Sequence, residues 1–204
     1  EQKIINQSEN PTEGFEHVEE VELVSYELKK FGQLLYKSNF NVMEFLFHGK
    51  TVMNGDPMAI DALKQIIEDY LPGMVPYHYR GMAKQNYHKY LDRDGGNYRP
   101  VAKKFLYVIR GLLAAEYVQR NHTIEPDINV LKRNLSREGE EIVDELIAVK
   151  RSDEFEYAPD DLQDQAHELI SNLFNSLELE EDKKVEMTGY KEDINDWMLK
   201  IRNS

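Results

Sequence analysis

The chain has 204 residues, 41% of them hydrophobic, and a formal net charge of −13 at pH 7. This length and composition are enough to bury a hydrophobic core, so we do not expect a disordered chain. The lack of cysteine excludes disulfides, Cys-ligated zinc and thiol nucleophiles, and fits a reducing compartment. The sequence holds no apolar run of about 18 residues, so we expect a soluble, cytoplasmic protein without a membrane partner.

The first part of the chain is expected to contain little strand. Residues 3–6 could form a short strand, and residues 18–24 alternate so that Glu20 and Glu22 share one side of another. This second strand either carries acids toward a site or is an edge strand protected by charge. A helix is predicted for residues 26–37.

The rest of the chain is expected to be helical. Asn41 and Glu44 form a capping-box pattern for a short helix. Pro57 opens a helix that runs to Tyr70, where Pro72 and the glycine after it are expected to end it. Later helices are predicted for residues 76–91, 101–121, 129–134, 138–149, 159–177 and 190–201.

A basic island covers residues 80–120 of this acidic chain. It holds nine Lys/Arg against three acidic residues, a balance of +6. Lys103, Tyr107 and Arg110 are spaced to share one face of a helix. Two cations beside a phenol suit a polyanion such as a triphosphate, but a solvated basic face that balances the acidic surface would have the same spacing.

The acidic residues concentrate in residues 138–204, with twenty Asp/Glu against seven Lys/Arg. We expect this segment to form acidic outer helices that aid solubility, or a surface for a basic protein partner. Its charge argues against non-specific duplex binding. Binding of single-stranded RNA is favoured by the basic island and its tyrosines, and opposed by the overall charge.

Motifs of several common enzyme classes do not occur in the sequence. The six histidines include no His-x-x-x-His pair, which argues against a zinc site. No G-x-S-x-G, P-loop or G-x-G-x-x-G pattern is found. Serine hydrolases, Walker-type ATPases and dinucleotide oxidoreductases are therefore disfavoured.

Four segments, in order, resemble the RlaP-type nucleotidyltransferases of the DNA polymerase beta-like superfamily. They are ELKKFGQLLYKSNFNVMEFLF (27–47), HYRGMAKQNYHKYL (78–91), KKFLYVIRGLLAAEYV (103–118) and ELIAVKRSDEFE (145–156). The resemblance covers roughly residues 18–156. It implies an α+β, predominantly helical fold: the end of a nucleotidyltransferase mixed sheet and the first helix in residues 1–37, then a helical domain in residues 38–204.

This resemblance implies transfer of a nucleotidyl group from a nucleoside triphosphate, ATP being expected, to an acceptor hydroxyl. Two Mg²⁺ ions held by carboxylates would stabilise the attacking and leaving oxygens, since Mg²⁺ prefers oxygen ligands. RNA, a protein or a small molecule could each supply the acceptor hydroxyl.

The resemblance also assigns roles to particular residues. Glu22 stands where the family has its third catalytic, metal-binding carboxylate, although the family has Asp there. The residues that match the family's phosphate-binding helix are Lys103, Lys104, Tyr107 and Arg110. Arg110 could bind phosphate oxygens in a bidentate way, with Lys103 as a point charge. Lys30 is a weaker candidate, since a solvated helix lysine would look the same.

The sequence departs from the family pattern at its catalytic opening. It contains no Gly-Ser dipeptide, and no Asp-x-Asp precedes the matched region. Asp92 and Asp94 lie in a predicted loop and are interpreted as turn formers. Either the catalytic segment lies upstream of these residues, or the protein is a non-catalytic homologue that binds nucleotides or proteins. His78 and Tyr79 could stack on a base, or could be core residues.

Overall fold

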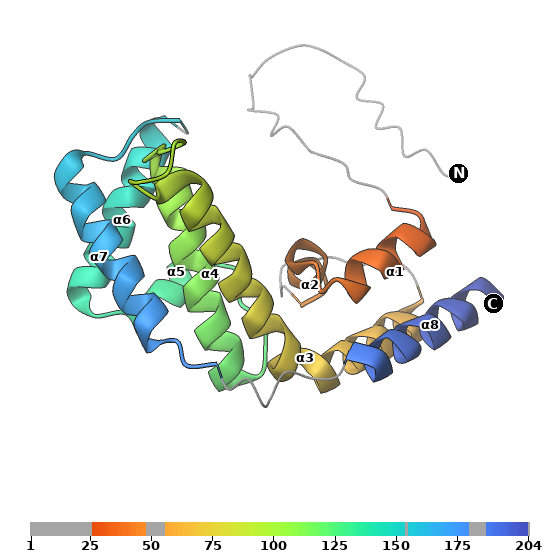
Figure 1. Ribbon diagram of the computed structural model, residues 1–204. Coiled ribbons are helices and arrows are strands. Elements are labelled where there is room, and N and C mark those ends of the chain that lie inside the picture. The colour runs from red at the N-terminus through yellow and green to blue at the C-terminus, as the bar shows by residue number, and fades with distance from the viewer. Residues whose placement is uncertain (1–25, 48–55, 154, 180–186, 204) are drawn as a thin grey trace, which may run out of the picture.

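The computed structural model describes residues 26–47, 56–153, 155–179 and 187–203, and these residues are mostly helical (Figure 1). The elements are α1 (Leu28–Tyr36), α2 (Phe40–Phe47), α3 (Pro57–Asn86), the π-helix η1 (Tyr87–Leu91), α4 (Ala102–Asn121), α5 (Ile128–Leu131), the 3₁₀-helix η2 (Lys132–Asn134), α6 (Arg137–Ser152), α7 (Asp160–Ser176) and α8 (Met187–Asn203). A predominantly helical chain is thereby confirmed. The predicted strands at residues 3–6 and 18–24 lie outside the described residues.

Extended pairing within the described ranges consists of one isolated antiparallel bridge, between Val101 and Tyr157. The predicted end of a mixed sheet is therefore not seen in the part of the chain that the structure describes. The predicted division after residue 37 stays a prediction. None of the described helices is long and apolar enough to cross a bilayer.

Helix α3 corrects the predicted end at Pro72. It continues through Pro72 and Pro76 to Asn86, and the π-helix η1 follows directly. A proline inside a helix costs about 3 kcal/mol or more, because it lacks an N–H and clashes with the preceding turn. Here the residues around the prolines are buried, including Leu71 and Val75. A buried apolar side chain adds about 1.5–3 kcal/mol of stability. The burial of the residues around the prolines therefore offsets the cost of having proline inside the helix.

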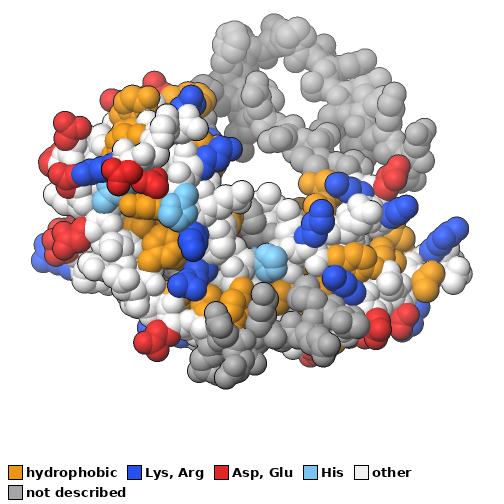
Figure 2. Space-filling model, viewed as in Figure 1, with side chains coloured by type: hydrophobic (Ala, Val, Ile, Leu, Met, Phe, Trp, Pro, Cys, Tyr) orange, Lys and Arg blue, Asp and Glu red, His pale blue; other side chains and the backbone are white. Residues whose placement is uncertain are grey.

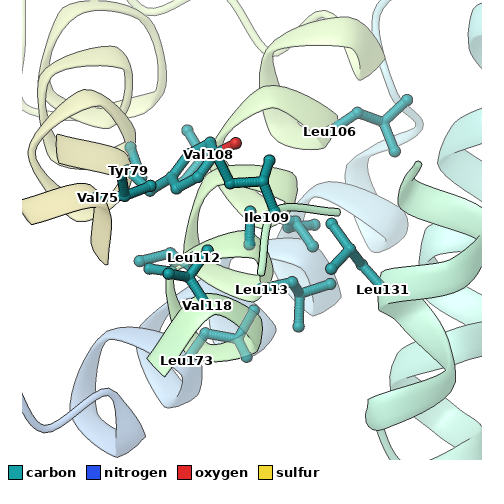
Figure 3. Close-up of a cluster of buried hydrophobic side chains, with 14 of the residues drawn as sticks. Val75, Tyr79, Leu106, Val108, Ile109, Leu112, Leu113, Val118, Leu131 and Leu173 are labelled. Carbon is teal, nitrogen blue, oxygen red and sulfur yellow. The ribbon is translucent and has the colours of Figure 1, made fainter. Parts of the chain in front are cut away.

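Helices α3 and α4 form the most extensive helix pair of the described fold. Figure 3 shows Val75 and Tyr79 of α3 beside Val108 and Ile109 of α4, all of them buried. The crossing is close at Gly111, where an added Cβ would lie 3.2 Å from the Ala83 Cβ and 3.3 Å from the carbonyl oxygen of Tyr79. A larger residue at this position would push the two helices apart.

Helix α8 packs along the first half of α3, and α1, from the opposite end of the described chain, packs on α8 (Figure 1). Helix α2 contacts both α1 and α3. The Trp197 indole N–H of α8 donates to the Ala59 carbonyl of α3 at 2.8 Å. The buried Tyr190 hydroxyl of α8 donates to the Leu35 carbonyl of α1 at 3.0 Å. Helix α8 is therefore part of the packed fold and not only an acidic outer helix.

Helices α6 and α7 pack against α4 and against each other. Ser136 caps α6 by accepting from the Gly139 amide at 3.2 Å, as its position before a helical pattern suggests. Glu141 and Asp144 are exposed on α6. Figure 2 shows acidic side chains gathered over α6 and α7.

His167 of α7 is half-buried between the rings of Tyr87, Tyr98 and Phe105. Its Nδ1 lies 3.3 Å from the Tyr87 hydroxyl, and its Nε2 lies 3.4 Å from the Tyr98 hydroxyl. The Tyr98 hydroxyl donates its proton to Gln163 at 2.7 Å, so it can only accept from His167. This chain of hydrogen bonds fits a neutral His167 with its proton on Nε2.

We predict that His167 makes the fold less stable in mild acid. Burial lowers the pKa of His167 from its usual 6.5, and the charge of Arg93 adds to this, while Asp164 opposes it. Below about pH 6.5 the unfolded chain therefore takes up a proton more readily than the folded one, so stability falls as the pH drops. Urea unfolding at pH 7.5 and pH 5.0 should show a larger loss for the wild type than for His167→Gln, which cannot titrate. Equal losses would contradict the prediction.

We predict opposite effects of leucine at two helical glycines. Gly111→Leu should lower the free energy of unfolding by about 1–3 kcal/mol, because the side chain overpacks the α3–α4 crossing. Gly81→Leu is the matched control, since Gly81 is exposed on α3 and a Cβ there meets nothing within 4 Å. Gly81→Leu should raise the free energy of unfolding by up to about 1 kcal/mol, because leucine has a higher helix propensity than glycine. Urea unfolding measures the free energy of unfolding of both variants. An unchanged free energy of unfolding in Gly111→Leu would refute the close crossing.

Candidate functional site

The start of α4 is fixed by the segment that follows α6. The Ala102 amide donates to the Glu156 carbonyl at 3.1 Å, and the Ala158 amide donates to the Pro100 carbonyl at 2.9 Å. Val101 is the N-cap residue of α4 and is extended, as N-cap residues usually are. This anchoring places Lys103 in the first turn of α4, followed by the other predicted phosphate-binding residues.

Lysines and tyrosine rings alternate at this end of α4. The Lys103 Nζ lies 5.8 Å from the centre of the Tyr107 ring. The Lys104 Nζ lies 4.0 Å from the Tyr90 ring of η1 and 5.8 Å from the Tyr107 ring. The predicted cations of α4 thus lie together, but Lys104 is nearer to η1 than to Tyr107.

Arg110 forms an ion pair that the sequence analysis did not predict. Its Nη1 donates to the Glu44 carboxylate of α2 at 2.7 Å, and the two side chains are only 19% and 14% exposed. The same carboxylate oxygen accepts from the Tyr79 hydroxyl of α3, also at 2.7 Å. Arg110 further contacts the Pro126 carbonyl at 3.4 Å. These bonds tie α2, α3 and α4 together at one point.

Tyr79 is a core residue, which confirms the second of its two predicted roles and excludes base stacking by its ring. It has no exposed surface. Burial raises the pKa of its hydroxyl, and the charge of Glu44 and the hydrogen bond to it raise it further. The hydroxyl therefore stays protonated and serves as a donor to Glu44.

The capping-box prediction for Asn41 and Glu44 is also wrong. Glu44 bonds to the side chains of Tyr79 and Arg110, and the side chain that accepts from the start of α2 is Asn39, 3.4 Å from the Val42 amide. The turn-forming role of Asp92 is confirmed, because its carboxylate accepts from the Asp94 amide at 3.1 Å.

A pocket with a volume of about 350 Å³ opens where α2, α3 and α4 meet. Its lining residues are Asn41, Met82, Asn86, Tyr107 and Arg110. Small-molecule sites commonly have volumes of about 300–1,000 Å³ and a few polar groups among apolar ones. The pocket therefore has the size for a nucleotide-like ligand, with Arg110 as its cation.

The other predicted site residues are not brought to this pocket. Lys30 is exposed on α1 and is not among the lining residues. Glu22 lies outside the described residues. Within the described ranges, no three His, Asp or Glu side chains come close enough to hold a metal ion. The described part thus lacks the carboxylate set that two Mg²⁺ ions need.

Sequence reasoning missed Glu44 as the partner of Arg110, although the sequence carried a signal. Glu44 is the one acid in the otherwise apolar and amide sequence of α2, FNVMEFLF. Carboxylates are seldom buried without a partner, so an acid in such a helix indicates a buried ion pair. Met82 and Asn86 also line the pocket, and the sequence could not show this, because it depends on the continuation of α3 through its prolines.

The chain matches the family described as "RlaP: RNA repair pathway DNA polymerase beta family" over residues 6–200. It therefore belongs to this family. It is 31% identical over 121 residues to the "Uncharacterized protein YcgL" of Bacillus subtilis (strain 168). That match covers 59% of this chain and 45% of the relative. The comparison with solved structures gave no significant match.

We predict that the Tyr79 hydroxyl stabilises the fold more than another fully buried tyrosine hydroxyl does. Tyr79→Phe should lower the free energy of unfolding by about 1.5–3 kcal/mol, because the lost hydrogen bond goes to a charged group. Tyr190→Phe is the matched control, since its hydroxyl donates to a neutral carbonyl, and should cost about 0.5–1.5 kcal/mol. Urea unfolding at pH 7.5 compares them. A smaller loss for Tyr79→Phe would contradict the bond to ionised Glu44.

Proposed function

We propose that the protein transfers a nucleotidyl group from a nucleoside triphosphate to an acceptor hydroxyl, and that the pocket between α2, α3 and α4 binds the triphosphate. The observation that carries the proposal is the position of Arg110 and Tyr107 in the wall of a pocket of about 350 Å³. Lys103 lies next to Tyr107 on the same helix. Family membership supports the reaction class.

In the proposed reaction the acceptor oxygen attacks the α-phosphorus and forms a new O–P bond. The bond from this phosphorus to the bridging oxygen breaks, pyrophosphate leaves with the electron pair, and the hydroxyl proton passes to solvent. Lys103 and Arg110 would bind phosphate oxygens and balance the charge of the leaving pyrophosphate, with Lys104 nearby. ATP is the proposed donor.

Mg²⁺ is part of the proposal by family membership alone, with Glu22 as one of its ligands. Two metal ions would stabilise the attacking and leaving oxygens, which requires further carboxylates from outside the described residues. Lys30 is proposed as a secondary phosphate contact.

The ion pair with Glu44 would hold the guanidinium of Arg110 in a fixed orientation at the pocket wall. A guanidinium carries several N–H donors in a planar fork, so a carboxylate on Nη1 is compatible with a phosphate on the same cation. Preorganisation of this kind lowers the entropy lost when the ligand binds.

A second candidate is a non-catalytic homologue that binds nucleotides or proteins. The Arg110–Glu44 pair favours it, because an arginine matched by a buried carboxylate can be purely structural. Its acidic helices, α6 and α7, would then be the surface for a basic partner. Incubation with α-³²P-labelled ATP, Mg²⁺ and candidate RNA, protein and small-molecule acceptors separates the two, since only the transferase labels an acceptor.

We predict that the double variant Lys103→Ala/Arg110→Ala binds ATP at least tenfold more weakly than the wild type. Two charge-assisted phosphate contacts together contribute about 1.4 kcal/mol or more, which is a factor of ten in affinity. Isothermal titration with ATP, with and without Mg²⁺, measures the change. Dependence on Mg²⁺ that is lost in Glu22→Gln would indicate a metal site that includes Glu22.

The matched control is Arg133→Ala/Lys150→Ala, which also removes two positive charges, both from exposed side chains outside the pocket. It should leave the affinity for ATP unchanged. Thermal unfolding of each variant shows whether the fold survives loss of the Arg110–Glu44 pair. The milder variant Arg110→Lys keeps the charge and tests the bidentate contact alone. Equal affinities in a folded Lys103→Ala/Arg110→Ala variant and the wild type would refute the site.

A further inference from the structure

A strip of lysines and tyrosines runs from η1 onto the first turns of α4. We call it the lysine–tyrosine strip, and its members are Lys89, Tyr90, Lys103, Lys104 and Tyr107. Four lysine–ring contacts fall within it. Cations and aromatic rings are therefore concentrated at this place.

The strip alternates cations and ring faces. Lys89 Nζ lies 4.9 Å and Lys104 Nζ lies 4.0 Å from the centre of the Tyr90 ring. Lys104 also lies 5.8 Å from the ring of Tyr107, which is 38% exposed. Lysine side chains are long and flexible, so they can leave the rings and reach phosphates when a ligand arrives.

The strip contains three lysines and no acidic residue, although the chain as a whole is acidic. The contact with Lys89 lowers the pKa of the Tyr90 hydroxyl, and the charges of Lys104 and Arg99 lower it further, while burial opposes them. All the charged groups that act on this hydroxyl are cations. With a chain charge of −13, a local positive field of this kind selects for an anionic ligand.

The strip is continuous with the proposed nucleotide pocket, because Tyr107 belongs to both. From Lys103 to Arg110 the helix axis advances about 10 Å, at 1.5 Å per residue. A chain molecule lying on the strip would therefore have its end close to Arg110.

We propose that the lysine–tyrosine strip binds single-stranded nucleic acid, with bases stacked on Tyr90 and Tyr107 and phosphates on the lysines. The proposal that this strand is the acceptor, with its terminal hydroxyl at the pocket, rests on the proposed function. Aromatic faces bind unpaired bases of any sequence, and neighbouring cations follow the backbone. A duplex hides its base faces, so the strip fits a single strand better.

The test is fluorescence anisotropy with labelled 12-nucleotide oligo(dT) and oligo(U), at salt concentrations from 50 to 300 mM. Tyr90→Ala should weaken binding about 5- to 150-fold, the effect of one lost stacking contact. Lys89→Ala/Lys104→Ala should reduce the slope of log affinity against log salt by about 1.4, since each phosphate contact contributes about 0.7. The control Arg133→Ala/Lys150→Ala should leave both the affinity and the slope unchanged.

The same variants separate this inference from the proposed function. Tyr90→Ala and Lys89→Ala should keep their affinity for ATP within twofold, and Lys89→Ala replaces Tyr90→Ala if the latter fails to fold. Equal affinity for DNA and RNA, or a preference for RNA, supports the inference. The inference would be overturned if neither oligonucleotide bound detectably at 50 mM salt. It would also be overturned if a blunt duplex bound with equal affinity, or if the variants bound the oligonucleotides as the wild type does. Retained ATP binding in that case would leave the proposed function standing.

Discussion

The close crossing of α3 and α4 is the constraint on which the rest of the described structure depends. Gly111 lets the α4 backbone approach Tyr79 and Ala83 of α3. Across this crossing, the hydroxyl of Tyr79 and the guanidinium of Arg110 reach the same Glu44 carboxylate. Packing and electrostatics thus support each other, because the apolar crossing excludes water and the buried ion pair fixes how α2 sits on the two helices.

The distribution of charge supports the proposed site for an anionic ligand. Exposed acids such as Glu141 and Asp144 lie on α6, whereas the lysines of the strip lie on η1 and the first turn of α4. The part-buried Glu44 is bonded to Arg110 in the pocket wall, and the two charges balance each other. The surface next to the pocket therefore stays positive while the whole protein keeps the net negative charge that favours solubility.

Most helices could be predicted from sequence, because periodicity and caps are local signals. The helix opened by Pro100 is an example, since α4 covers residues 102–121. The continuation of α3 through Pro72 could not be predicted, because burial by distant helices outweighs the local cost of proline. The basic face of α4 was visible in the spacing of its residues. The pairing of Arg110 with Glu44 was not, since it joins residues 66 positions apart.

The central claim is that the pocket at the α2–α3–α4 junction binds the triphosphate of a nucleotide. A crystal structure of the protein with a non-hydrolysable ATP analogue tests it most directly. The account predicts phosphate oxygens within hydrogen-bond distance of Arg110 and Lys103, with the Arg110–Glu44 pair retained. An analogue bound elsewhere on the protein, with this pocket holding only water, would contradict the account.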